Sequence, residues 1–149
     1  MKMERLASSF KTIHFVEIVL MMSLFMGLIV KFVFHYQADF FLEIFAIGLT
    51  LVYFPFGFYF IKKPSENYTH TTSVVLGFIY CLGVITILIS AVNIDSYRYP
   101  LILDFSVLLA LIIYLIVQLR KDDFPCTYVN TQFIRVAFIM ICSIFILLK

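Results

Sequence analysis

The chain has 149 residues, of which 63% are hydrophobic and 13% are charged, and its mean hydropathy is +1.05. A typical soluble domain is about 45–50% apolar and about 25% charged, and a small soluble fold cannot bury so large an apolar excess. The composition therefore excludes an ordinary soluble domain and indicates a protein that lies in lipid. The formal net charge of +2 is spread along the chain without a basic block, which argues against nucleic acid as a partner.

Five apolar runs approach the length of about 20 residues that a membrane-spanning helix needs. We expect spans at about 13–34, 40–61, 73–94, 101–119 and 131–148. The sequence thus predicts an all-α fold, a polytopic transmembrane helix bundle with a single integral membrane domain over residues 1–149. A bundle of four spans, in which the last segment lies in the membrane interface, is the alternative.

Lysines and arginines gather in alternate connections, and this asymmetry predicts the orientation of the chain. The N-terminal tail is basic, and so are the second connection, with Lys62 and Lys63, and the fourth connection, with Arg120 and Lys121. Cytoplasmic connections carry the excess of positive charge in membrane proteins. We therefore expect a multi-pass protein of the inner (plasma) membrane with a cytoplasmic N-terminus. An odd number of spans places Lys149 outside.

Three charged residues fall inside expected spans near the outer surface: Lys31, Glu43 and Asp104. Lys31 and Glu43 are equally far from the middle of the first outer turn, so an antiparallel hairpin brings them to one depth. Asp104 lies about one turn into its span from the same side. These residues are a candidate intramembrane cluster, in which opposite charges would lower each other's cost. The favoured interpretation is that each charge snorkels to water, and a structural pair and a role in handling protons or ions are the alternatives.

Glu17 and Arg135 lie near the cytoplasmic ends of the first and last spans. Their similar depth predicts a second ion pair on the inner side of the membrane. Arg135 is only about one turn into its expected span, from which its guanidinium can also snorkel to the headgroups.

Side chains suited to catalysis or ligation are scarce in this sequence. Cys81, Cys126 and Cys142 have no C-x-x-C spacing and no neighbouring histidine, so no metal, cofactor or redox site is expected. No nucleophile–base pair or glycine-rich phosphate loop is present, and an enzyme is not expected. Pro55 and Gly57 interrupt the second span, where they are expected to kink the helix.

One hairpin resembles the membrane part of the GldL-type gliding-motility and type IX secretion family. The resemblance rests on the Gly-x-x-x-Lys run from Gly27 to Lys31, on His35, and on the tripeptide 47–49, which reads Ile-Gly-Leu. In that family a membrane lysine works with a membrane glutamate to use the proton gradient. Val52 stands where the family has its glutamate, so the resemblance implies a role for Lys31 only.

These observations favour a non-enzymatic integral membrane protein, an accessory or scaffold subunit of a membrane complex. The alternative is a small transporter or proton-coupled component that uses Lys31, Glu43 and Asp104. A membrane enzyme acting on lipid is a third class, for which the sequence offers no catalytic set. The expected partners are the lipid bilayer and either other membrane subunits or further copies of the chain.

Overall fold

Five α-helices account for nearly all of the residues that the computed structural model describes, which are 2–56, 70–92, 98–120 and 126–148. The helices are α1 (Lys2–Phe32), α2 (Asp39–Phe56), α3 (His70–Val92), α4 (Arg98–Arg120) and α5 (Cys126–Leu147). The predicted all-α fold is confirmed.

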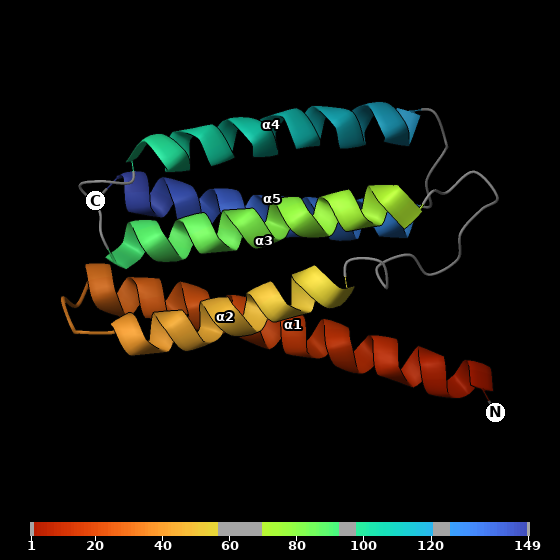
Figure 1. The fold of residues 1–149 in the computed structure, drawn as a ribbon, viewed down its shortest axis with the longest axis horizontal. Helices are drawn as coiled ribbons and strands as arrows, with labels where there is room; N and C mark the ends of the chain where they lie inside the picture. The colour runs from red at the N-terminus through yellow and green to blue at the C-terminus, as the bar shows by residue number, and fades with distance from the viewer. Residues whose placement is uncertain (1, 57–69, 93–97, 121–125, 149) are drawn as a thin grey trace.

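Successive helices run in opposite directions, and the two chain ends lie at opposite ends of the bundle (Figure 1). The central helix is α3, which packs against α2, α4 and α5. The α1–α2 hairpin forms one side of the bundle and the α4–α5 hairpin the other. The backbones of α1 and α5 approach each other closely at few positions, so these two helices meet mainly through their side chains.

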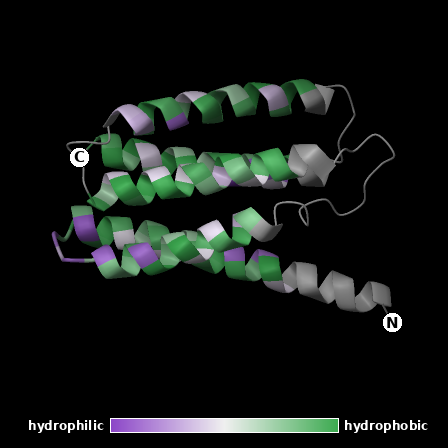
Figure 2. Ribbon diagram, in the orientation of Figure 1, coloured by the Kyte–Doolittle hydropathy of each residue, from purple (hydrophilic) through white to green (hydrophobic). Residues whose placement is uncertain are grey.

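Each helix buries one stripe of side chains, as α1 illustrates. Its buried residues Met21, Leu24, Leu28 and Phe32 follow one another at intervals of three or four, the spacing that keeps them on one helical face. The opposite face is apolar as well, and Met26 is 55% exposed. A helix that is apolar on all sides suits a lipid environment. Hydrophobic residues, coloured green in Figure 2, predominate along the described parts of all five helices.

Among the described residues, four helical segments are long and apolar enough to cross a membrane. They are Thr12–Phe32, Val74–Val92, Tyr99–Val117 and Val129–Leu147. The last segment, for which the interface was the alternative, therefore meets the requirements for a span. The description of α2 stops at Phe56, so residues 57–61 of the expected second span lie outside the described residues, as does Gly57 of the expected kink.

A tight connection and a close helix contact form the α1–α2 hairpin. His35 has a φ of 55°, a left-handed conformation that allows the chain to turn shortly after the end of α1. Gly27 faces α2, and a Cβ at this position would lie 2.9 Å from Leu42 Cδ2. The absence of a side chain at Gly27 therefore lets α1 and α2 approach closely.

Candidate functional site

The predicted inner-side residues Glu17 and Arg135 lie in contact in the structure. Arg135 Nε donates a hydrogen bond of 2.5 Å to Glu17 Oε1, and Arg135 Nη2 donates one of 2.8 Å to Glu17 Oε2. The two side chains are only 4% and 1% exposed. This geometry is bidentate: two parallel hydrogen bonds join the planar guanidinium to the carboxylate. It is the strongest form of such an ion pair.

Arg135 does not snorkel, contrary to one sequence-based expectation. The helix α5 begins at Cys126, five residues before the expected start of the span, so Arg135 lies more than two turns into the helix. From this depth the guanidinium turns inward to Glu17 rather than outward to the surface. The ion pair thus joins α1 to α5, which also meet where the ring of Phe145 lies 6.1 Å from those of Phe25 and Phe32.

Three further polar side chains extend this ion pair into a buried polar layer. The hydroxyl of Tyr80 on α3 donates a 2.8 Å hydrogen bond to Gln132 Oε1 on α5. The ring of Tyr53 on α2 lies 5.5 Å from that of Tyr80, centroid to centroid, and its hydroxyl is within electrostatic range of the ion pair. We define the polar layer as Glu17, Tyr53, Tyr80, Gln132 and Arg135, all of which are buried.

The polar layer has one contact with a more exposed group. His14 Nδ1 lies 3.2 Å from Glu17 Oε2, and the His14 side chain is 53% exposed. This histidine is one turn before Glu17 on α1, toward the N-terminal end of the helix. The Glu17 carboxylate is therefore reached by Arg135 from inside the bundle and by His14 from its surface.

Sequence reasoning missed Tyr53, Tyr80 and Gln132. The available signal was the spacing of Gln132 and Arg135, which at i and i+3 share one helical face. A polar and a charged residue on one face of an otherwise apolar helix indicate that this face points into the bundle.

Lys31, Glu43 and Asp104, the expected outer cluster, do not come together in the structure. Lys31 forms its ion pair with Asp39, the first residue of α2. Glu43 is exposed on α2, since it follows the buried Leu42 and so points about 100° away from the packed face. Asp104 lies on α4, which packs against α3 and α5 rather than against the α1–α2 hairpin. Among the described residues, no ion pair connects any two of the three.

We expect the variant Lys31→Met to change the free energy of unfolding by less than about 1 kcal/mol, because exposed ion pairs contribute little. The side chains of Lys31 and Asp39 are 18% and 47% exposed, so the pair is not enclosed by the bundle. Thermal unfolding of the purified chain in detergent measures the effect, with Glu43→Gln as a control at an exposed position. A loss above about 2 kcal/mol would contradict the assignment of this ion pair to the surface class.

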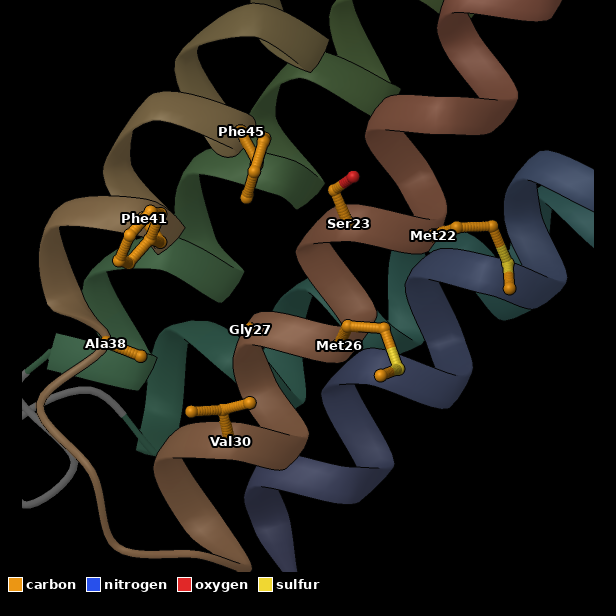
Figure 3. A pocket seen from close by; sticks show the side chains of 8 residues that line it. All are labelled: Met22, Ser23, Met26, Gly27, Val30, Ala38, Phe41 and Phe45. Carbon is orange, nitrogen blue, oxygen red and sulfur yellow. The ribbon is translucent and has the colours of Figure 1, made fainter.

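A shallow apolar groove lies between the C-terminal part of α1 and the N-terminal part of α2 (Figure 3). Its volume is about 440 Å³, and it opens broadly to the surroundings of the bundle. It is lined by Met22, Ser23, Met26, Gly27, Val30, Ala38, Phe41 and Phe45. Ser23 is the polar residue of this lining, so the groove suits hydrocarbon and offers little to hold a polar ligand.

No group of three histidine, cysteine, aspartate or glutamate side chains in the described part of the chain is placed to hold a metal ion. Cys81 and Cys142 are free thiols buried in helix packing, and the side chain of Cys126 lies outside the described residues.

The chain matches no protein-family model, no curated protein and no solved structure. The resemblance of the hairpin around Lys31 to the GldL-type family therefore stays a prediction. In the structure Val52, which stands at the position of that family's glutamate, is partly buried.

Proposed function

We propose that this chain is a non-enzymatic integral membrane protein that acts as a helical scaffold or accessory subunit in a membrane complex. The observation that carries the proposal is the buried pair of Glu17 and Arg135, in which the two charges satisfy each other. Both carboxylate oxygens of Glu17 accept bonds from Arg135, so the pair joins α1 to α5 and holds these helices in place.

Helices in lipid do not gain a hydrophobic driving force from association, so packing and polar contacts between them hold a bundle together. The ion pair supplies such a contact between α1 and α5, and the bond from Tyr80 to Gln132 supplies one between α3 and α5. The ion pair thus links the α1–α2 hairpin to α5, and the second bond links α5 to the central helix α3. A rigid bundle with an apolar surface is the arrangement that a scaffold for other membrane helices requires.

The proposal includes the inner (plasma) membrane, a cytoplasmic N-terminus and a C-terminus outside. Its support is the distribution of positive charge, since the N-terminal tail and the connections with Lys62–Lys63 and Arg120–Lys121 are the basic ones. The positions of the chain ends at opposite ends of the bundle agree with this orientation (Figure 1).

A proton-coupled component that uses Lys31, Glu43 and Asp104 gains no support from the positions of these residues. Coupling within one site requires the groups to approach one another, but Lys31 is engaged with Asp39 and Glu43 is exposed. Asp104 remains as a buried carboxyl at a separate place in the bundle.

The test combines crosslinking in native membranes with flux measurements on the purified chain. A photoreactive residue is introduced at Met26 on α1 or, in a matched variant, at Ile113 on α4, both of which are exposed. We expect one of these faces to give a reproducible protein adduct with another membrane subunit or a second copy. We also expect liposomes with the chain alone to pass protons no faster than empty liposomes.

Two results together would contradict the scaffold proposal. One is ion flux through liposomes that contain the chain alone, and the other is that both faces give adducts with lipid but none with protein. Flux that persists in the Lys31→Met and Glu43→Gln variants would further exclude these two residues from the conducting site.

A further inference from the structure

Asp104 is a buried carboxyl located where α3, α4 and α5 meet. The residue is 7% exposed, and it faces Gly83 of α3. A Cβ at Gly83 would lie 3.4 Å from Asp104 Oδ2, 3.5 Å from Oδ1 and 2.9 Å from Ile139 Cγ2 on α5. Because Gly83 has no side chain, both carboxyl oxygens can approach the α3 backbone.

Among the side chains that the structure describes, none supplies a counter-charge to this carboxyl. Asp104 Oδ2 is buried without a hydrogen-bond partner in the described part of the chain, and none of the ion pairs found there includes Asp104. The described segment 74–92 of α3 contains no lysine, arginine, aspartate or glutamate. On α5 the charged residue is Arg135, whose guanidinium is directed at Glu17.

The other titratable groups near this level of the bundle are uncharged at neutral pH in their ordinary state. On α3 they are Tyr80, which is bonded to Gln132, and Cys81. On α5 the nearest one is Cys142, one turn beyond Ile139. Along α4 the titratable residues whose side chains the structure describes, besides Asp104, are tyrosines at 99 and 114. None of these groups supplies a positive charge to Asp104. The helix also begins with Arg98 and ends with Arg120, whose side chains lie outside the described residues.

An ionised carboxylate without a partner is costly in an apolar interior, and a membrane protein avoids the cost by neutralising or pairing the group. Within the described ranges Asp104 has no ion-pair partner, so neutralisation by a proton remains. Asp104 is six residues after Arg98, the start of α4, which places it about 9 Å along the helix from that end. Asp104 thus lies within the first two turns of α4, so a short chain of water molecules entering from that end could carry a proton to it.

We propose that Asp104 is a proton-binding site, in which the carboxyl is held as the neutral acid against Gly83 and exchanges its proton with the aqueous phase. The ligand is the proton itself, and the site is separate from the polar layer around Glu17 and Arg135. The inference goes beyond the scaffold function, because a scaffold does not require a titratable group in this position.

Infrared spectroscopy of the full chain in liposomes at neutral pH tests the proposal. The carbonyl stretch of a protonated carboxylic acid is resolved from the bands of carboxylates and amides. We expect such a band in the unaltered chain, its loss in Asp104→Asn, and its retention in Asp39→Asn, the matched control with an exposed and ion-paired aspartate. Transfer to D₂O is expected to shift the band to lower frequency.

The experiment does not depend on the folding of a variant, since ¹³C labelling of aspartate carboxyls shifts the band in the unaltered chain as well. The absence of a band sensitive to this label would overturn the proposal, because Asp104 would then be ionised. A band that persists in Asp104→Asn would do the same. A band that does not shift in D₂O would show a neutral acid that does not exchange, and would overturn the assignment as a proton-binding site.

Discussion

Replacing Arg135 with methionine is expected to lower the free energy of unfolding by about 3–5 kcal/mol, because removal of one partner leaves the other as an uncompensated buried charge. Glu17 is 1% exposed and cannot reach water without moving its helix. Its remaining polar neighbour His14 makes a single contact of 3.2 Å from the bundle surface and cannot replace the two guanidinium bonds. Glu17→Leu should be destabilising for the same reason, with Arg135 as the orphaned charge.

The double variant Glu17→Leu/Arg135→Met distinguishes an ion pair from two independent contributions. Apolar replacement of both partners in a buried pair is often neutral or stabilising, so the double variant should be more stable than either single variant. Unfolding in mixed detergent micelles measures all four proteins of the cycle. Additive losses in the double variant would show that Glu17 and Arg135 do not act as a unit.

The second large effect is expected at Gly83, where alanine should destabilise the bundle by about 1–3 kcal/mol, the range for an overpacked interior. The new Cβ would lie 2.9 Å from Cγ2 of Ile139, a β-branched side chain with little freedom to rotate, and close to both oxygens of Asp104. The helices α3, α4 and α5 would therefore have to separate locally.

Gly48→Ala is the matched control for this substitution. Its Cβ would meet the tip of Leu20, with the nearest atom Cδ2 at 3.2 Å, and a leucine side chain can move by a few tenths of an ångström at low cost. Alanine is also preferred over glycine in a helix by about 1 kcal/mol. Thermal unfolding in detergent should thus show Gly48→Ala as neutral or stabilising. Equal effects at Gly83 and Gly48 would contradict the packing described for α3.

The sequence predicted the helices well because lipid imposes a simple requirement on length and polarity. An apolar run of about 20 residues can satisfy its backbone only as a helix in that solvent. Depth in the membrane is likewise encoded by distance along the chain from a connection, and the contact between Glu17 and Arg135 follows from their similar depth. The helix α1 nevertheless begins at Lys2 and α5 at Cys126, both earlier than the expected spans, because polar flanks can extend a helix beyond its apolar part.

Depth alone does not determine which way a side chain points, and this explains why the predicted outer cluster does not form. Glu43 has the depth of Lys31, but it is next to the buried Leu42 and therefore leaves the helix in another direction. Lysine has a long flexible stem that carries its ammonium toward the surface, where Asp39 lies at the start of α2. The predicted pair of Lys31 and Glu43 therefore does not form, and Lys31 pairs instead with Asp39, which lies nearer to the turn.

The contacts of Asp104 and Gln132 could not be predicted from the sequence for a different reason. Each depends on which helices are neighbours in the bundle, and α3 lies beside α5 although α4 separates them along the chain. The bond from Tyr80 to Gln132 spans 52 positions, a separation about which periodicity within a single helix carries no information. Mid-span polar residues indicated that partners exist but not which ones.

The length of α1 limits how the bundle can sit in a bilayer. The helix contains 31 residues and measures ~45 Å, against about 30 Å for the hydrocarbon layer. Its apolar segment starts only at Thr12, and Figure 1 shows the preceding turns projecting past the neighbouring helices. The first turns of α1 are therefore not needed to cross the hydrocarbon layer, and the helix is longer than its apolar segment by residues 2–11.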